Sequence, residues 1–358
     1  MFRSVLFGLL SAVTVLCSTA TYSADLKIAS WNIGNLAGKP GIPLRGHARD
    51  EAEYQHIRDI VAKVAPDVIG LQEMGSFGSA RAVLSNEYEI VFETRCLQNA
   101  KQCKEDVGDI FTAIAYRKSL GTPTEVQVPG LAVMHTSECA GEMPRPVRGG
   151  VGLEFDRNGK KVVILSVHLK ASCKNNSAET SADQKDDCAT LMKQVEVLLD
   201  WIKKERQAGK TVIVAGDFNR QLIDHNDNVA AKFKAADSGI RFEPTQRECW
   251  ASFPNRGNAI ISAANAKFPE IAAAGGRPLP YSPKSNSKID YFVISGDGPL
   301  ASPAAEQYPM GTEAKTTDFA TDYLKTCAGT PNKFEDGSVL TFSEVEPSDH
   351  CPISMSLP

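Results

Sequence analysis

The sequence predicts an α/β fold in which helices cover two packed β-sheets. Short runs rich in β-branched residues alternate along the chain with stretches whose apolar residues recur at helical spacing, and this alternation is typical of the α/β class. The strand-like runs are numerous, which favours two packed sheets over one. We therefore expect the main core to lie between the sheets and the helices to lie outside.

Eight runs are predicted to be strands because they are short and apolar. Such runs are typical of strands that are buried mostly on both faces. They are Leu26 to Trp31, Val68 to Leu71, Phe111 to Tyr116, Val151 to Phe155, Val162 to Val167, Val212 to Ala215, Ile289 to Ile294 and Ile353 to Leu357.

Two stretches are predicted to be amphipathic helices because their apolar residues fall on one helical face. Pro66 limits the first stretch and Gly209 follows the second, and both residue types end helices. The apolar positions are Ile57, Ile60, Val61 and Val64 in the first stretch and Leu191, Val195, Leu198, Leu199 and Ile202 in the second.

We expect residues 25–358 to form a single domain, because the segments that carry polar motifs are spread along most of the chain and must converge. Irregular segments between the predicted elements are expected to be surface loops, and the last two are long. These segments are 95–110, 172–188, about 225–286 and about 296–347.

Residues 1–24 have the composition of a secretory signal peptide: Arg3, then the apolar run from Val5 to Cys17, then small residues up to Ala24. The run from Val5 to Leu16 is shorter than the roughly 20 apolar residues that a spanning helix needs. We therefore expect a secreted or periplasmic protein, with no stable membrane insertion after cleavage. We expect it to be a monomer.

The cysteines also indicate an oxidising compartment. Nine cysteines become eight once Cys17 is removed, and an even number in an exported chain is typical of disulfide bonding. The spacings from Cys96 to Cys103 and from Cys173 to Cys188 suit local bridges. Zinc bound by thiolates is the minor alternative, because the chain has no Cys-x-x-Cys pair.

The net charge argues against binding nucleic acid by charge alone. Loss of Arg3 leaves 38 of the 39 basic residues against 43 acidic ones, a net charge of −5, which is the wrong sign for a protein that wraps nucleic acid electrostatically. Nucleic acid remains open as a substrate, since a bound metal ion supplies a local positive field.

Polar side chains stand where several predicted strands end, although a core does not tolerate them without a reason. If these strand ends meet at one edge, they form a basin of carboxylates, amides and imidazoles. Oxygen ligands of this kind match a hard divalent cation, and two histidines can divide the proton transfers of ester hydrolysis. The residues are Asn32, Glu73, His168, Asp217, Asn219, Asp290, Asp349 and His350.

Together these motifs resemble the endonuclease/exonuclease/phosphatase superfamily, which includes pancreatic-type deoxyribonucleases, abasic-site endonucleases, inositol-polyphosphate phosphatases and bacterial sphingomyelinases. Each motif alone is unspecific, but all of them occur in the family's order. The resemblance implies a four-layered α/β sandwich, with two packed mixed β-sheets flanked by helices. The motifs are Ser30-Trp31-Asn32-Ile33, Leu71-Gln72-Glu73, Ser166-Val167-His168-Leu169-Lys170, Gly216-Asp217-Phe218-Asn219, Ile289-Asp290-Tyr291 and Ser348-Asp349-His350.

The resemblance implies a metal site. Asn32 and Glu73 would hold a divalent ion, and Asp349 would contribute to it or to a second ion. Mg²⁺ is the expected ion, with Ca²⁺ or Mn²⁺ as alternatives. Taken alone, Glu73 could be a surface residue at a strand-to-helix turn.

The resemblance also implies a division of the chemistry. His350, paired with Asp290, would activate water, and Asp217 would orient the nucleophile. Asn219 and His168 would bind the phosphoryl oxygens, although the sequence offers no assignable carboxylate partner for His168. The structural alternatives are a turn at Asp217-Phe218-Asn219 and a core histidine at position 168.

Basic residues near the motifs are candidates for binding the substrate. Arg145 and Arg148 lie just before a predicted strand, and Lys170 follows the His168 motif. Arginine can hold a phosphate through two parallel hydrogen bonds. A solvated loop is the alternative explanation for all three residues.

The expected activity is therefore hydrolysis of a phosphodiester by metal-assisted attack of water, and we favour a nuclease that acts on DNA or RNA. The alternative substrate is a small or lipid phosphate, cleaved by a phosphomonoesterase or a sphingomyelinase-like esterase. A hypothesis of another class is a catalytically silent binding module of the same fold. The polar residues at the strand ends argue against such a module, because a protein that catalyses no reaction has no physical need for uncompensated carboxylates there.

Overall fold

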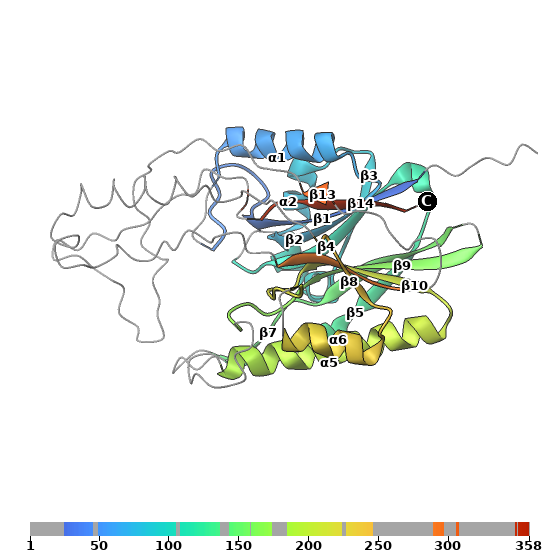
Figure 1. Cartoon of the computed structure of the whole chain (residues 1–358). Coiled ribbons are helices and arrows are strands. Elements are labelled where there is room, and N and C mark those ends of the chain that lie inside the picture. Colours follow the sequence, from blue (N-terminus) through green and yellow to red (C-terminus); the bar gives the residue numbers. More distant parts are fainter. Residues whose placement is uncertain are drawn as a thin grey trace, which may run out of the picture.

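The computed structural model describes residues 25–45, 49–104, 108–136, 143–157, 159–173, 185–223, 227–245, 289–296, 306–307, 348 and 350–357. The predicted signal peptide, Asp349 and most of both predicted long loops lie outside these residues. The described chain forms four layers, in the order helices, sheet, sheet, helices (Figure 1). This arrangement confirms the expected α/β sandwich of two mixed sheets.

Each main sheet has six strands in the described chain. The first has the order β13 (Glu306–Gln307), β14 (Ile353–Leu357), β1 (Leu26–Leu36), β2 (Val68–Met74), β4 (Phe111–Arg117) and β3 (Tyr88–Phe92). The second has the order β11 (Arg241–Glu243), β12 (Asp290–Ser295), β10 (Thr211–Asp217), β9 (Lys160–His168), β8 (Gly150–Arg157) and β5 (Thr124–Val128). A separate ribbon pairs β6 (Met134–His135) with β7 (Arg145–Pro146).

Helices cover the outer face of each sheet (Figure 1). Helices α1 (Glu51–Val64) and α2 (Phe77–Val83) pack on the first sheet, and α5 (Lys185–Gln207) and α6 (Asn228–Ala236) pack on the second. The short helices are α3 (Thr94–Gln98), α4 (Ala100–Lys104) and the 3₁₀ turns η1 (Lys118–Leu120) and η2 (Pro129–Leu131).

Both predicted helices are present, as α1 and α5. Asp50 caps α1 by accepting a hydrogen bond from the Glu53 backbone N–H at 2.9 Å, and the Glu53 carboxylate accepts one from the Asp50 N–H at 2.8 Å. This reciprocal pair satisfies two backbone donors at the start of the helix. The helix ends at Ala65, in the left-handed conformation at φ +46°, directly before Pro66.

Parts of the predicted loops are regular and correct the sequence analysis. The 95–110 segment contains most of α3 and all of α4, and the 225–286 segment contains α6 and β11. Helix α6 forms because Asp227 caps it and Val229, Ala230 and Phe233 bury one face. Its alanine-rich composition is favourable for a helix, but the surrounding Ala, Gly, Pro and Asn obscured its short period.

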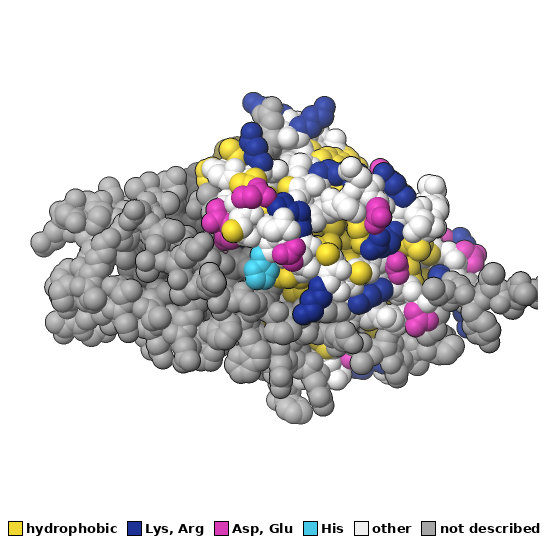
Figure 2. Space-filling view, turned by 90° about the horizontal axis from the view of Figure 1, so that it is seen from above, with side chains coloured by type: hydrophobic (Ala, Val, Ile, Leu, Met, Phe, Trp, Pro, Cys, Tyr) yellow, Lys and Arg dark blue, Asp and Glu magenta, His cyan; other side chains and the backbone are white. Residues whose placement is uncertain are grey.

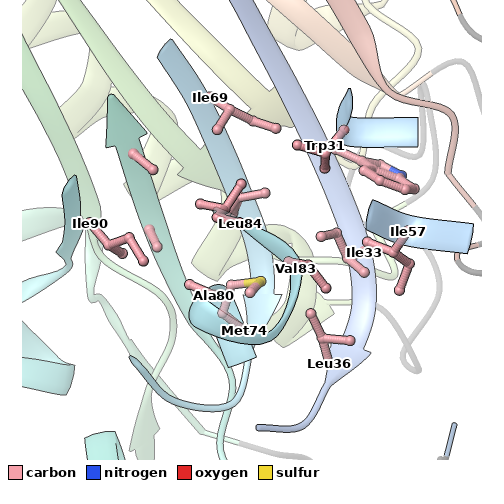
Figure 3. Packing of buried hydrophobic residues seen from close by; sticks show 14 of the residues in the cluster. Trp31, Ile33, Leu36, Ile57, Ile69, Met74, Ala80, Val83, Leu84 and Ile90 are labelled. Atoms are coloured by element: carbon pink, nitrogen blue, oxygen red, sulfur yellow. The ribbon is translucent and has the colours of Figure 1, made fainter. Parts of the chain in front are cut away.

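The two faces of the first sheet contribute to two different hydrophobic cores, because the side chains of each strand alternate between the faces. In β1, Ile28 packs against the second sheet, whereas Ala29 and Trp31 pack against the helices, because successive side chains of a strand point to opposite faces. Figure 3 shows the outer core, where Trp31 and Ile33 of β1 lie beside Ile57 of α1.

Disulfides secure two of the segments beside the sheets. The bridges Cys96–Cys103 and Cys173–Cys188 are present, as their spacing predicted. Cys351 is also disulfide-bonded. These bonds fit an oxidising compartment.

The surface over α1 carries charges of both signs. Figure 2 shows Lys and Arg side chains interspersed there with Asp and Glu side chains. A surface that binds nucleic acid by charge alone would instead concentrate basic residues. In the described part of the chain, no helix combines the length and the apolar character needed to cross a membrane.

Candidate active site

The polar strand ends face the space between the two sheets. In β1, Ile28 belongs to the core between the sheets, and Asn32 has the same parity along the strand. In β10, Ile213 and Ala215 belong to that core, and Asp217 has their parity. Because strand side chains alternate with a period of two, Asn32 and Asp217 point toward the opposite sheet.

The same alternation holds in two further strands. Val162 and Ile164 of β9 lie in the core between the sheets, and His168 shares their parity. Phe292 of β12 lies there too, and Asp290 precedes it by two residues. Four strands thus deliver polar side chains to the same space.

Strand register sets these residues side by side. Asp217 of β10 is paired with His168 of the parallel strand β9 and with Asp290 of the antiparallel strand β12. Gly216, at φ +150°, permits this close pairing, because a Cβ there would lie 2.0 Å from the Val167 carbonyl oxygen.

Glu73 reaches the site through an irregularity in β2. The β1–β2 register shifts at this end of the strands, and Glu73 has a left-handed φ of +61°, which costs roughly 1–3 kcal/mol for a residue with a side chain. Its carboxylate accepts hydrogen bonds from the Asn32 Nδ2 at 3.3 Å and the Asn35 N–H at 2.9 Å. This strained backbone therefore aims a carboxylate at the strand ends.

Asn219 also has a left-handed backbone, at φ +52°. Its N–H donates to Asp217 Oδ1 at 2.7 Å, and its side-chain Nδ2 donates to the Leu169 carbonyl at 3.0 Å. Residues Asp217 to Asn219 therefore do form a turn, and this turn holds the side chains of Asp217 and Asn219 beside His168.

His350 forms a buried dyad with Asp290. His350 Nδ1 lies 2.7 Å from Asp290 Oδ2, and both residues are 4% exposed. The His350 backbone is held on both sides, because its N–H donates to Ser348 Oγ at 2.9 Å and its carbonyl accepts from Trp31 Nε1 at 2.9 Å. The ring is therefore fixed in orientation.

The second nitrogen of His350 faces the rest of the cluster. His350 Nε2 lies 3.4 Å from Asn32 Nδ2 and 3.7 Å from Asp217 Oδ2. Asn32 Nδ2 in turn donates to Asp217 Oδ2 at 3.0 Å. These contacts join the strand ends of both sheets into one site.

His168 has carboxylates nearby that the sequence could not assign. Its Nε2 lies 3.5 Å from Asp217 Oδ2 and 3.8 Å from Glu73 Oε1. Every predicted catalytic or metal-binding residue that the structure describes therefore lies in this one cluster. Asp349 lies outside the described residues.

The cluster carries more buried negative charge than a core normally holds. Burial raises the pKa of Asp217 to about 7, the positive charge of His350 opposes that rise, and Asp290 adds to it. A carboxylate that is buried and poorly compensated resists ionisation. A divalent cation would supply the missing positive charge.

The donor set fits such a cation. One ligand atom from each of Asp217, Asp290 and His350 lies within 4.8 Å of the others. Asn32 and Glu73 add hard oxygen donors, which suit Mg²⁺, Ca²⁺ and Mn²⁺. The site therefore has more potential ligands than the three that the sequence analysis named.

Among the basic residues proposed to bind substrate, Arg148 lies nearest to this chemistry. It is 8% exposed, and its pKa falls to about 10 because burial outweighs the attraction of Glu73 and Asp217. Lys170 is bound by Asp187, with 2.6 Å between Nζ and Oδ1. Arg145 is exposed and lies opposite His135 in the β6–β7 ribbon.

Arg220, another basic residue near the motifs, is already committed to partners within the fold. Arg220 and Asp227 form an ion pair at 2.7 Å, with both side chains 0% exposed. Arg220 also donates to the Cys173 carbonyl at 3.1 Å. Its role is to connect the turn after Asp217 to the disulfide-bonded segment after His168.

Sequence reasoning missed several buried polar residues around the site. Gln72 Nε2 donates to Ser166 Oγ at 3.0 Å and so links the two sheets. Glu93 and Gln194 are 0% exposed and bind backbone groups beside Arg148. Their partners are distant in the sequence, so no local pattern could have revealed them.

Comparisons with known proteins identify a family but no individual relative. A model of the Endonuclease/Exonuclease/phosphatase family matches residues 29–350. No curated protein sequence matches the chain. Similar solved structures include D. rerio TDP2 complexed with a single-strand DNA product, at 20% identity, 93% coverage of this chain, 99% coverage of that chain and a TM-score of 0.47.

Two further solved structures are similar at the same level. The human Nocturnin catalytic domain with a bound sulfate anion has 16% identity, with 93% of each chain covered and a TM-score of 0.44. The Bacteroides thetaiotaomicron mannosyl-6-phosphatase has 16% identity, with 92% of this chain and 98% of that chain covered and a TM-score of 0.44. Likeness at this level identifies no substrate. The match over residues 29–350 does identify the family: the chain belongs to the endonuclease/exonuclease/phosphatase family, whose members are metal-dependent phosphoester hydrolases.

Proposed function

We propose that the protein is an exported, divalent-metal-dependent phosphodiesterase in which the His350–Asp290 pair activates the attacking water. The observation that carries this proposal is the buried 2.7 Å contact between His350 Nδ1 and Asp290 Oδ2, next to Asp217 and Glu73. An imidazole that is oriented by a carboxylate is a general base of the kind that hydrolysis needs.

Asn32 and Glu73 would hold the divalent ion, with Asp217 and Asp349 as further ligands. Mg²⁺ is the preferred candidate, and Ca²⁺ and Mn²⁺ suit the same oxygen donors. When bound, the ion neutralises phosphate charge and polarises the phosphoryl oxygen.

The proton transfer starts at His350. A water molecule beside Nε2 gives its proton to that nitrogen as its oxygen forms a bond to phosphorus. The P–O bond to the leaving group breaks, and the leaving oxygen takes a proton from solvent. Asp290 accepts the Nδ1–H hydrogen bond and stabilises the resulting imidazolium. Asp217, whose Oδ2 lies 3.7 Å from His350 Nε2, orients the nucleophile on the same side.

The phosphoryl oxygens would be bound by donors on the second sheet. His168 Nε2 lies 3.5 Å from Asp217 Oδ2 and 3.8 Å from Glu73 Oε1. The Asn219 amide keeps one N–H beyond the one that it donates to Leu169. The Arg148 guanidinium would supply a positive charge that pairs with the negative charge of the substrate phosphate.

We favour DNA or RNA as the substrate, and a small or lipid phosphate is the second substrate class. A nucleic acid would contact the cluster and the buried Arg148 beside it. The surface over α1 mixes charges of both signs (Figure 2) and is not the basic face that binding by charge alone requires. Such binding should weaken as salt increases.

Export is the second part of the proposal. It is supported by the composition of residues 1–24 and by the disulfides Cys96–Cys103 and Cys173–Cys188. Cell fractionation of a C-terminally tagged chain tests it directly. Recovery of the protein in the cytoplasm with residues 1–24 still attached would contradict export.

The activity is tested by a turnover screen with plasmid DNA, RNA, a chromogenic phosphodiester, a chromogenic phosphomonoester and sphingomyelin. Each substrate is incubated with Mg²⁺, Mn²⁺ or Ca²⁺ and with a chelator. We expect metal-dependent cleavage of a phosphodiester that His350→Ala and Glu73→Ala abolish. His56→Ala on α1, in the helix layer outside the first sheet, is the matched histidine control and should keep full activity.

Each outcome separates the alternatives. Cleavage of only the phosphomonoester would replace the diester proposal with a phosphatase. No cleavage of any substrate with any of the ions would leave the binding module as the function. Full activity of His350→Ala would remove the proposed base from the mechanism.

A further inference from the structure

The Arg148 side chain is buried but incompletely satisfied. Its Nη2 donates to the Leu169 carbonyl at 2.8 Å, whereas its buried Nε has no hydrogen-bond partner among the described residues. Buried polar atoms are normally paired. A guanidinium in this state, electrostatically coupled to Glu73 and Asp217, indicates an anionic ligand that arrives from outside the chain.

The peptide unit that follows Arg148 is held from both sides. The Gly149 N–H donates to Glu93 Oε2, and the Arg148 carbonyl accepts from Gln194 Nε2 at 3.4 Å. Glu93 and Gln194 are both 0% exposed. Glu93 follows β3 of the first sheet, and Gln194 belongs to α5, which covers the second.

The contact with Glu93 requires glycine at position 149. A Cβ on Gly149 would lie 2.6 Å from Glu93 Oε2, which is closer than nonbonded atoms tolerate. The Glu93 carboxylate can therefore approach the backbone directly. Any larger residue at position 149 would displace either the carboxylate or the peptide.

Arg95 completes the first clamp. Its Nε donates to Glu93 Oε2 and its Nη2 to Glu93 Oε1, each at 3.1 Å. Arg95 Nη1 also donates to the Pro146 carbonyl at 3.2 Å, two residues before Arg148. The Glu93–Arg95 pair thus fixes the chain on both sides of Arg148.

Gln194 forms the second clamp. Its Oε1 accepts from the Lys170 N–H at 2.7 Å, and its Nε2 also donates to the Leu131 carbonyl at 2.9 Å. Lys170 follows Leu169, whose carbonyl accepts from Arg148. Gln194 therefore holds both the backbone of Arg148 and the segment that orients its guanidinium.

We propose that Glu93 and Gln194 are positioning residues that lock the Arg148–Gly149 peptide from opposite layers and so aim Arg148 at the substrate phosphate. This inference rests on the proposed function, because it takes Arg148 as a phosphate-binding residue. Glu93 and Gln194 act through Arg148, and neither is assigned a contact with the reacting atoms. Their effect should therefore disappear when Arg148 is absent.

The test is a set of double-mutant cycles. Glu93→Gln and Gln194→Met are each made in the wild-type chain and in the Arg148→Ala chain. Glu93→Gln leaves one oxygen where the Gly149 and Thr112 N–H groups now have two, and Gln194→Met removes the donor to Arg148. The readouts are KM and kcat for the chromogenic phosphodiester and the Kd of inorganic phosphate measured by calorimetry.

We expect each single variant to raise KM and weaken phosphate binding about tenfold, because misplacement of a charged hydrogen-bond donor is costly. In the Arg148→Ala background the same changes should alter both quantities less than about twofold, since residues that act through one group are not additive. Tyr88→Phe, which removes a buried hydrogen bond to the Pro66 carbonyl at the other end of β3, should leave KM and phosphate affinity unchanged.

Two outcomes would overturn the inference: unchanged phosphate affinity in the single variants, or an equal loss with and without Arg148, which would make the role purely structural. If Glu93→Gln or Gln194→Met does not fold, Gly149→Ala supplies the same displacement of the peptide. Phosphate binding also separates the two proposals. A wild-type chain that binds phosphate but cleaves nothing would refute the proposed function alone, and one that binds no phosphate would refute the inference.

Discussion

Replacing Asp227 with asparagine should destabilise the fold strongly. Asp227 Oδ2 lies 2.7 Å from Arg220 Nη2 and 3.0 Å from Nε, and both side chains are 0% exposed. The substituted amide would keep an oxygen for the N-terminal cap of α6, where Oδ1 now accepts from the Ala230 N–H at 2.8 Å. The substitution therefore removes the charge of Asp227 while preserving the cap.

The magnitude follows from the partners that Arg220 retains. Removing one member of a buried ion pair costs about 3–5 kcal/mol, and Arg220 keeps the carbonyl of Cys173 and the side chain of Asn228 as acceptors. We therefore expect the lower end, a loss of about 3 kcal/mol. Asp227→Ala also removes the cap and should lose about 1 kcal/mol more.

Equilibrium urea unfolding followed by tryptophan fluorescence, without reductant, measures these losses. The matched control is Asp50→Asn, the same substitution at the exposed cap of α1, which should change the free energy of unfolding by about 0.5 kcal/mol or less. If Asp227→Asn costs no more than Asp50→Asn, the buried pair does not stabilise the fold in the way argued.

Three further predictions concern the site and its supports. Asp290→Asn should lower kcat about 10²–10⁴-fold with a small change in KM, because His350 loses its orienting partner; steady-state kinetics measure this, and an unchanged kcat would contradict it. Asp217 has a pKa that burial raises from 3.8 to about 7, so the metal-free protein should lose stability as pH rises from about 4 to about 7, where the unfolded chain ionises this group but the folded chain resists. Thermal midpoints in chelator should fall less steeply over this range for Asp217→Asn, and identical slopes would exclude Asp217 as the cause. Replacing Cys173 and Cys188 together with serine should lower the free energy of unfolding by about 2–4 kcal/mol; urea unfolding measures this, and an unchanged free energy of unfolding would show that the bridge is dispensable.

Much of the fold was predictable because its central strands are apolar on both faces. Val212 to Ala215 and Val162 to Val167 lie within β10 and β9, and the polar residues that follow them gather as expected. The edge strands β3 and β5 were missed because both have only five residues and short strands carry a weak local signal; most of β5 is also partly exposed.

The sequence predicted which residues form the site better than it predicted how they are arranged. A strand buried on both faces does not reveal which side chains face the opposite sheet, so the sequence named Asp217 without placing it beside Asp290. The left-handed backbone of Glu73 arises from a register shift between strands, which is a tertiary feature. Glu93 is 56 residues from Gly149, and no pattern in the chain joins them.

The long sequence separations across the site govern when a growing chain can become active. Trp31 donates to the carbonyl of His350, 319 residues further along. β14, which follows that histidine, pairs with β1, although the two strands are far apart in the sequence. The ribosome therefore completes every other described site residue before it adds the proposed base and the strand that anchors it. A nascent or truncated polypeptide without His350 and β14 would carry the carboxylates but not the proposed base, so hydrolysis would begin only after this segment has been added.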